Sequence, residues 1–273
     1  MSLRPPAEAP TGSTVSASSD FSVASINLHW GRDVTGRPFD VADACSRVGA
    51  DVIALQEVWT PVGGESVASA AAGRLGRQVM ELPLTDRADI DGFRIVDVGE
   101  PGRGSWGLAI LTAAPVVDYR TIALGQAHRD SVARAVQVVV LEVAGGRRLR
   151  VVNTHLTHRV YQSPWQFARL VRRLGRPELP TVVLGDLNLP GLVAATAPGL
   201  RRAVRGATWP ARHPRVQLDH ILVSPECAVT GSGVGVEIGS DHRPVRASLR
   251  ISGQRGTGGA SAGCRGSTGR DHR

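Results

Sequence analysis

Short runs of Val, Ile, Leu and Ala recur along the chain, separated by segments rich in Gly, Pro and Asp. Apolar runs of this length between turn-forming residues are typical of buried β-strands. The pattern predicts strands at residues 21–29, 51–55, 107–111, 116–124, 133–143, 148–155, 181–185, 218–223 and 244–251. Ala-Gly-Gly separates the fifth and sixth of these runs, which predicts a β-hairpin.

Helical patterns lie between some of these runs. Residues 37–48 carry Asp40 in the expected first turn and Gly49 just past the end, where these residue types favour helix termini. Residues 66–75 are rich in Ala and also read as a helix. A chain that mixes buried strands with helices in this way is predicted to be an α/β protein.

The clearest helical pattern begins at Ser163. Ser163 as N-cap, Pro164 as the first helical residue and Gln166 at the third position would form a capping box. Gly175 is expected to end the helix. The apolar residues between these signals follow the spacing of one helical face and are Phe167, Leu170, Val171 and Leu174.

The two ends of the chain differ from its middle. Residues 1–20 are rich in Pro, Ser, Thr and Ala, and residues 252–273 are rich in Gly, Ser and Arg. Neither can bury enough apolar surface to offset the entropy of ordering, so we expect both to be disordered. Residues 21–251 would then form one folded domain with a sizeable core. With no apolar signal or membrane-spanning stretch, we expect a cytoplasmic monomer.

Composition narrows the chemistry. All 32 basic residues are Arg, which a GC-rich codon usage explains more simply than selection, and the formal net charge is +8. Without Lys, no lysine nucleophile or phosphate-loop lysine is available. The positive excess suits an anionic substrate, although no basic stripe interleaved with aromatic residues is evident. Three cysteines without metal-like spacing argue against a zinc site or a disulfide framework.

Polar side chains follow several of the apolar runs, where α/β folds gather ligand sites. Glu57 follows one run closely and would need a cation or a partner if buried. His155 ends another run, and Asp186 and Asn188 follow a third, spaced so that both can face one way. Each has a simpler interpretation: a surface Glu, a hydrogen-bonded core His, an Asx turn.

Two Asp-His pairs stand near the end of the domain, Asp219-His220 and Asp241-His242. A carboxylate that accepts from Nδ1 of a histidine orients the ring and leaves Nε2 free as a general base. Because an Asp cannot easily reach the ring of its own neighbour, we expect Asp219 to pair with His242. Asp241 would then be free for a metal. Surface turns are the simpler interpretation of either pair, but the coincidence of so many polar strand ends favours a site.

Six motifs occur in an order that resembles the endonuclease/exonuclease/phosphatase superfamily. They are Asn27, Leu55-Gln56-Glu57, Asn153-Thr154-His155-Leu156, Gly185-Asp186-Leu187-Asn188, Leu218-Asp219-His220-Ile221 and Ser240-Asp241-His242-Arg243-Pro244. The resemblance covers essentially all of the expected domain. It implies a four-layer α/β sandwich of two packed mixed β-sheets flanked by helices, with the active site at one edge of the sheets.

The resemblance also implies a metal site. Glu57 would be the main ligand of Mg²⁺, with Mn²⁺ as an alternative, and Asn27 and Asp241 would complete the surroundings of the metal. Few carboxylates are expected there, because Mg²⁺ keeps several waters and substrate oxygens. Arg134 would either add a supporting contact to the substrate or be solvated. Trp209, followed by Pro, would shape a substrate wall or close a loop.

The catalytic roles are implied in the same way. His242 would be the general base, oriented by Asp219, and Asp186 would position the attacking water. Asn188 would bind the phosphate and His155 would hydrogen-bond a non-bridging oxygen. In-line attack on phosphorus requires charge on the equatorial oxygens to be neutralised, and this set of groups can do so.

The resemblance includes several activities. AP endonucleases usually carry a Lys soon after Gln-Glu; here Glu57 is followed by Val58-Trp59 and Lys is absent, which disfavours abasic-site repair. The preferred interpretation is a metal-dependent phosphodiesterase, nuclease-like, acting on a phosphate ester that could be nucleic acid. The alternatives are a phosphomonoesterase on inositol-phosphate-like or other small phosphates, and a noncatalytic polyanion-binding protein. Specificity would lie in loops near residues 59–65, 99–106 and 156–164.

Overall fold

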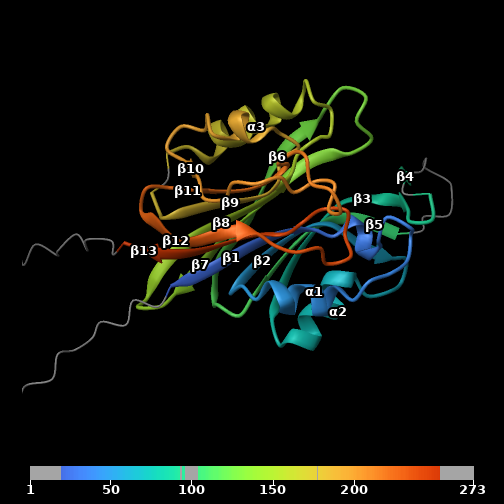
Figure 1. The fold of residues 1–273 in the computed structure, drawn as a ribbon, viewed down its shortest axis with the longest axis horizontal. Helices are drawn as coiled ribbons and strands as arrows, with labels where there is room; N and C mark the ends of the chain where they lie inside the picture. Colours follow the sequence, from blue (N-terminus) through green and yellow to red (C-terminus); the bar gives the residue numbers. More distant parts are fainter. Residues whose placement is uncertain (1–19, 93, 96–103, 177, 253–273) are drawn as a thin grey trace, which may run out of the picture.

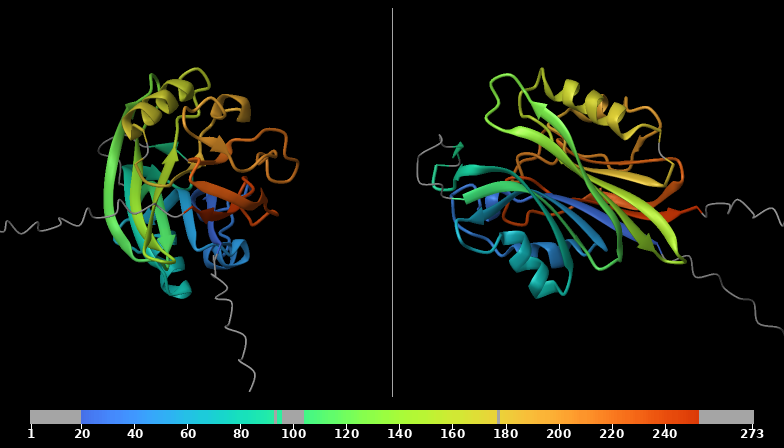
Figure 2. Two further views of the ribbon diagram at one scale, coloured as in Figure 1. Left: turned by 90° about the vertical axis from the view of Figure 1, so that its left-hand side faces the viewer. Right: turned by 180° about the vertical axis from the view of Figure 1, so that it is seen from behind.

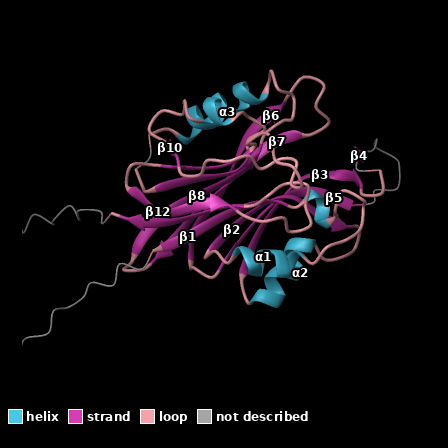
Figure 3. Ribbon diagram, viewed as in Figure 1, coloured by secondary structure: helices cyan, strands magenta, loops and turns pink. Residues whose placement is uncertain are grey.

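The computed structural model describes residues 20–252, with the exception of residues 93, 96–103 and 177. In this part of the chain two β-sheets pack against each other and helices cover their outer faces (Figure 1). Figure 3 shows α1 (Val41–Val48) and α2 (Val67–Leu75) below one sheet and α3 (Ser163–Leu174) above the other. The expected four-layer sandwich is confirmed.

The first sheet has seven strands and the second has six. The strand order of the first is β12 (Cys227–Val234), β13 (Val245–Ile251), β1 (Phe21–Asn27), β2 (Val52–Pro61), β5 (Gly104–Thr112), β3 (Gln78–Asp89) and β4 (Arg94–Ile95). That of the second is β10 (Arg201–Arg202), β11 (Asp219–Val223), β9 (Thr181–Asp186), β8 (Arg147–His155), β7 (Ala133–Val143) and β6 (Val116–Gln126). Both sheets are mixed, because β1–β2 and β8–β9 are parallel pairs among antiparallel ones.

Alternation along the strands builds the three largest hydrophobic cores of the described residues. In β1, Val23 faces the second sheet while Ala24 and Ile26 face α1 and α2, since successive side chains point to opposite faces. Helix α3 lies over the outer face of the second sheet (Figure 2). Phe167 and Leu170 of this helix form a third core with that face. Strands buried on both faces have continuous apolar sequences, which is why most of them were predictable.

A buried polar cluster joins the two sheets just behind the strand ends. The Gln56 amide donates to Asn153 Oδ1 at 2.8 Å. The Asn153 amide lies 2.9 Å from Gln137 Oε1 and 3.0 Å from the Leu55 carbonyl. None of the three polar side chains is exposed. Because unsatisfied buried amides are costly, this cluster favours one alignment of the sheets.

The helix ends follow the sequence signals in part. Helix α1 begins at Val41, not residue 37, because Asp40 is its N-cap and accepts from the Asp43 N–H at 2.9 Å. Gly49 ends the helix in the left-handed conformation, as predicted. None of the helices in the described residues is long and apolar enough to span a membrane.

The capping box predicted at the start of α3 is wrong. Gln162 occupies the N-cap position without a side-chain cap, and the Ser163 hydroxyl donates to the Asn188 carbonyl at 3.1 Å. The side chain of Gln166 instead binds the Thr157 N–H and the Gly125 carbonyl. The side chains of Ser163 and Gln166, which the capping box would have used, therefore form tertiary hydrogen bonds instead. Two further short helices are η1 (His29–Gly31) and α4 (Gly191–Ala194).

The sequence pattern missed β3 and β12. Strand β3 mixes charged and apolar residues and contains Pro83, and β12 is an edge strand with Gly231 and Gly233. Pro and Gly lower strand propensity, so neither segment reads as a strand in isolation. They form strands because each pairs with a neighbouring strand, β3 with β5 and β12 with β13.

The segments expected to be disordered, residues 1–20 and 252–273, lie outside the described residues except for the innermost residue of each. Asp20 belongs to the fold. Its carboxylate accepts from the Thr230 hydroxyl at 2.7 Å and pairs with Arg250 at 3.2 Å.

Candidate active site

Strand register places three of the predicted residues in a row across the second sheet. The parallel pairing of β8 and β9 sets His155 opposite Asp186. The antiparallel pairing of β9 and β11 sets Asp219 opposite Asp186 from the other side. All three residues are almost fully buried. Residues far apart in the sequence therefore meet at one edge of the sheet because the strands that carry them end there.

The first sheet contributes Asn27 and Glu57 at the same edge. The register of β2 against β5 shifts between Gln56 and Val58, so Glu57 sits on a bulge, with φ of 53°. A bulge redirects a side chain that regular alternation would place elsewhere. The Asn27 amide donates to Glu57 Oε1 at 3.3 Å and to Asp186 Oδ2 at 3.1 Å, which links the two sheets across the site.

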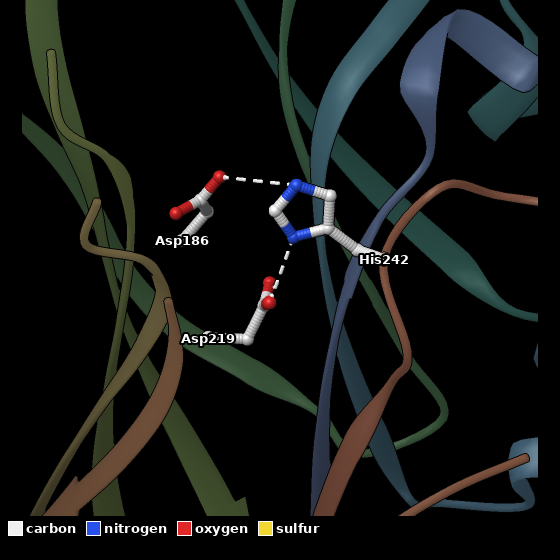
Figure 4. A group of neighbouring side chains, drawn as sticks. All are labelled: Asp186, Asp219 and His242. Atoms are coloured by element: carbon white, nitrogen blue, oxygen red, sulfur yellow. Dashed lines mark hydrogen bonds and ion pairs between the residues drawn. The ribbon is translucent and has the colours of Figure 1, made fainter. Parts of the chain in front are cut away.

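The predicted pairing of Asp219 with His242 is present. Asp219 Oδ2 lies 2.8 Å from His242 Nδ1, and His242 Nε2 points toward Asp186 Oδ2 at 3.9 Å (Figure 4). The loop that carries His242 is fixed by Ser240, whose hydroxyl donates to the Asn27 carbonyl at 2.7 Å and accepts from the His242 N–H at 3.1 Å. The ring is thus oriented with Nε2 directed into the site.

His155 and Asn188 form the other wall. Nε2 of His155 lies 3.4 Å from Asp186 Oδ2, 4.0 Å from Glu57 Oε1 and 3.2 Å from Asn188 Nδ2. The Asn188 N–H donates to Asp186 Oδ1 at 2.9 Å, with Asn188 at φ of 48°. The Asx turn considered as a simpler interpretation is therefore real, and it also directs the amide into the site.

The other members of the two Asp-His pairs, Asp241 and His220, have different surroundings. Asp241 is held by Trp209, whose indole N–H donates to Asp241 Oδ2 at 3.2 Å, so Trp209 positions a carboxylate and does more than close a loop. His220 is buried with Nε2 2.9 Å from the Leu189 carbonyl, away from the site. The first Asp-His pair thus supplies only its aspartate to the site.

A pocket of about 500 Å³ opens over these groups. It is lined by His29, Trp30, Glu57, Trp106, Asp130, Ser131, Val132, Arg134, His155, His158, Asp186, Asn188 and His242. The sequence did not indicate Trp30, Trp106 or Asp130, because nothing local marks a residue that reaches the site only through folding.

Arg134 is buried, which excludes the solvated alternative. Its guanidinium lies 3.3 Å from Asp130 Oδ2 and 5.0 Å from the centre of the Trp106 ring, and only 5 % of its side chain is exposed. One terminal nitrogen, Nη1, has no hydrogen-bond partner among the described residues. A buried donor without an acceptor beside this pocket is suited to an anionic oxygen.

Burial and crowding shift the pKa values of the site. Burial, followed by repulsion from Asp241, raises the pKa of Glu57. Burial also raises the pKa of Asp186 to about 7. Burial alone would lower the pKa of His242, but Asp219, with help from Asp186, more than offsets it and raises that pKa to about 10.

The pKa of His155 shifts in the opposite direction. Burial, followed by repulsion from Arg134, lowers the pKa of His155 well below its usual range. Neutral His155 can donate one N–H and accept at the other nitrogen. The two histidines on either side of Asp186 therefore have pKa values shifted in opposite directions, raised in His242 and lowered in His155. This arrangement is expected where acid and base roles are divided between two groups.

The carboxylates fit a divalent cation. Asp186, Asp219 and His242 offer atoms within 4.8 Å of one another, but the Asp219–His242 hydrogen bond already uses two of them. Glu57 and Asp241 are the remaining carboxylates, and their mutual repulsion is what a hard cation with oxygen ligands would relieve. Asn27 turns its amide nitrogen toward Glu57, so its role as a ligand stays a prediction.

Comparison with known proteins agrees with this geometry. Residues 24–242 match the model of the Endonuclease/Exonuclease/phosphatase family. A search of curated proteins finds no match. Among solved structures, an endonuclease/exonuclease/phosphatase from Beutenbergia cavernae is similar with a TM-score of 0.70, 19% identity and coverage of 86% of this chain and 72% of the other.

Two further solved structures share the fold. The human nocturnin catalytic domain with bound sulfate has a TM-score of 0.64 and 17% identity, covering 85% of this chain and 94% of the other. A mannosyl-6-phosphatase from Bacteroides thetaiotaomicron has a TM-score of 0.63 and 18% identity, covering 84% and 99%. With the family model spanning most of its length, this chain belongs to the endonuclease/exonuclease/phosphatase family of phosphoester hydrolases.

Proposed function

We propose that the protein is a divalent-metal-dependent phosphodiesterase, nuclease-like, that activates water with the Asp219–His242 pair. One observation carries the proposal: two histidines, Asp186 and Glu57 converge on a single pocket from both sheets. Divalent metals are generally used in this family, and we propose Mg²⁺, with Mn²⁺ as an alternative, for this chain. One chain supplies every proposed residue, which supports action as a monomer.

Glu57 would be the main ligand of the cation, with Asp241 beside it and Asn27 after a rotation of its amide. When bound there, a divalent cation would polarise the phosphoryl group and stabilise negative charge on its oxygens. The bulge at Glu57 and the hydrogen bond from Trp209 to Asp241 hold the two carboxylates in place without a metal. Such prior fixing reduces the reorganisation that binding requires.

His242 is placed to remove a proton from water. Its Nδ1 is engaged by Asp219, and its Nε2 lies too far from Asp186 for a direct hydrogen bond, at 3.9 Å, so a water can bridge the two. Asp186 would orient that water toward phosphorus. Asn188 and His155 would hydrogen-bond the non-bridging oxygens, and Arg134 could add a charged contact through its free nitrogen.

The main alternative is a phosphomonoesterase acting on an inositol-phosphate-like or other small phosphate. The charge of Arg134 beside the pocket would suit the dianion of a monoester as well as a diester. The third candidate, a noncatalytic polyanion-binding protein, is disfavoured because every proposed catalytic position carries a competent side chain.

The test is a substrate panel with the purified full chain. Bis(p-nitrophenyl) phosphate, p-nitrophenyl phosphate, single- and double-stranded DNA and RNA are incubated with Mg²⁺, with Mn²⁺ or with EDTA. We expect metal-dependent diester cleavage that exceeds phosphate release from the monoester. His242→Ala should abolish it, while His213→Ala, which changes an exposed histidine outside the pocket, should not.

Metal binding is measured separately by thermal unfolding. Mg²⁺ should raise the unfolding temperature of the wild type and of Glu65→Gln, a change at an exposed glutamate, but not of Glu57→Gln. No metal-dependent turnover of any diester would refute the proposal. Faster release from monoesters would favour the alternative, and full function in both Glu57→Ala and His242→Ala would favour a noncatalytic protein.

A further inference from the structure

The two most exposed aromatic side chains of the described residues lie four positions apart. Tyr161 is 89% exposed and Trp165 is 80% exposed, whereas three of the other four tryptophans are buried. Exposing a large aromatic ring forgoes the favourable free energy of its burial. In a chain with few aromatic residues, this pair marks a surface with a use beyond the core.

These rings line a groove beside α3. Tyr161 precedes the helix, and Trp165, Arg169 and Arg172 lie on one helical face by their spacing. We call this surface the Tyr161–Trp165 groove; its volume is about 590 Å³, and its floor is Leu124 and Ala127. A concave apolar floor with aromatic and arginine walls is suited to flat, charged ligands.

A third hollow links the groove and the active-site pocket through shared lining residues. This hollow of about 400 Å³ lies between the two, lined by residues of both neighbouring loops. It shares Tyr161 and Gln162 with the groove and His158 with the active-site pocket. A chain-like ligand whose phosphate occupies the active site could therefore extend along the surface to Trp165.

The charged side chains that line this surface are all basic. The sequence from Leu156 to Arg176 contains no Asp or Glu. Within the part of the chain that the structure describes, Arg129, Arg159 and Arg172 form no ion pair with a carboxylate. Arginines without carboxylate partners next to exposed aromatic rings are complementary to a ligand with repeated phosphates and stacking groups.

The two loops that form the surface are held in place. The side chain of Gln162 hydrogen-bonds both the N–H and the carbonyl of His128. Arg159 donates to the Arg129 carbonyl at 2.8 Å, and Gln166 fastens the first turn of α3 to Gly125 at 3.1 Å. The rings are thus presented by anchored backbone, which lowers the entropy cost of binding.

We propose that the Tyr161–Trp165 groove binds single-stranded nucleic acid, with bases stacked on Tyr161 and Trp165 and phosphates on the neighbouring arginines. This inference rests on the proposed function in taking the active site to receive one phosphodiester of the same strand. An anionic membrane is the other ligand with such chemistry. The rings line hollows that they share with arginine side chains, and this lining favours unpaired bases over lipid tails.

The test measures binding without turnover. Fluorescein-labelled single-stranded DNA and RNA of two and of twelve nucleotides are titrated with the full chain in EDTA, and anisotropy gives Kd. We expect the longer strands to bind more tightly, and Tyr161→Ala and Trp165→Ala each to raise their Kd about 5- to 150-fold. Arg172→Gln should reduce the salt dependence, by about 0.7 in the slope of log K against log salt for a lost phosphate contact.

Matched controls change exposed residues elsewhere. Tyr119→Ala and Arg148→Gln, on β6 and β8, should leave Kd and the salt slope unchanged. Both aromatic variants, Tyr161→Ala and Trp165→Ala, should hydrolyse bis(p-nitrophenyl) phosphate like the wild type, since we expect this small diester to bind in the active site without contacting the groove. Circular dichroism melts confirm that each variant is folded.

The outcomes separate the two proposals. If the wild type hydrolyses diesters and both aromatic variants bind oligonucleotides with the wild-type Kd, the groove proposal is wrong and the proposed function stands. Aromatic-dependent binding without any diester hydrolysis would support the groove and refute the proposed function. Co-sedimentation with phosphatidylcholine–phosphatidylserine vesicles that is lost in Trp165→Ala, without oligonucleotide binding, would replace nucleic acid by a membrane and overturn the proposal.

Discussion

His155 and Asp186 face each other in register across the parallel pair β8–β9, with Nε2 of one 3.4 Å from Oδ2 of the other. The contact depends on how closely the two strands approach. At Gly185 the backbone has φ of 145°, and a Cβ built there would lie 1.9 Å from the Thr154 carbonyl oxygen. The glycine next to Asp186 is therefore what lets the strands bring the two side chains together.

Gly185→Ala should accordingly disrupt both fold and site. The added methyl group must push β8 away from β9, so we expect at least about 3 kcal/mol of destabilisation and loss of diester hydrolysis. Gly73→Ala is the matched control, because it lies inside α2 with no atom near its Cβ position. That change should stabilise the protein by about 0.5–1 kcal/mol. Urea unfolding measures the free energy of unfolding of both variants, and equal values would contradict the argument.

Asp219→Asn should weaken catalysis and shift its pH dependence. His242 must be neutral to accept a proton, so activity should rise with pH toward its pKa. Asp219 is the main group that raises this pKa to about 10 against the effect of burial. Without its charge the pKa falls and the rising limb of log kcat/KM moves to lower pH, while kcat drops about 10²- to 10⁴-fold. A loss of kcat with an unmoved limb would mean that Asp219 acts only through packing.

The buried Asp130–Arg134 pair should make stability depend on pH. Burial raises the pKa of Asp130, but the charge of Arg134 and hydrogen bonds offset this and leave the pKa lowered. Ionised Asp130 therefore stabilises the fold above its unfolded pKa of about 3.9, and this contribution is lost as pH falls through the lower folded value.

We expect Asp130→Asn to be about 3 kcal/mol less stable than the wild type at pH 7, because Arg134 stays buried without its partner. The difference should shrink as the pH is lowered from 7 to 3, because pH 3 lies below the unfolded pKa of Asp130 and part of the stabilisation from its charge is lost there. Asp118→Asn, at an exposed carboxylate on β6, should show no difference at either pH. Chemical denaturation at both pH values measures this, and a gap that stays constant would show that the ion pair is not responsible.

Asn153→Leu should test the polar cluster between the sheets. The substitution leaves the buried amides of Gln56 and Gln137 with fewer partners, which should cost about 2–4 kcal/mol. In a double-mutant cycle, adding Gln56→Leu should cost less than it does alone, by at least about 1 kcal/mol. Additive effects would mean that the two side chains do not stabilise each other.

The sequence by itself determined the strands that are buried on both faces and the chemistry at their ends. Apolar runs predicted β1, β2, β9 and β11, which are buried on both faces over most of their length, and also the partly exposed strands β7, β8 and β13. The polar residues that follow those runs were then conspicuous, and the Asp219–His242 pairing followed from side-chain reach. Mixed strands such as β3 gave no such signal.

Only the tertiary structure decided what depends on contacts between distant segments. The bulge that redirects Glu57, the burial of Arg134 and the hydrogen bond from Trp209 to Asp241 leave no local pattern. The sequence pointed to the loop near residues 156–164 but not to the Tyr161–Trp165 groove, because the arginines in and around this groove come from two loops and a helix. Local sequence encodes the periodicity of single elements, whereas pockets and charge pairs arise from the register and packing that only the whole fold fixes.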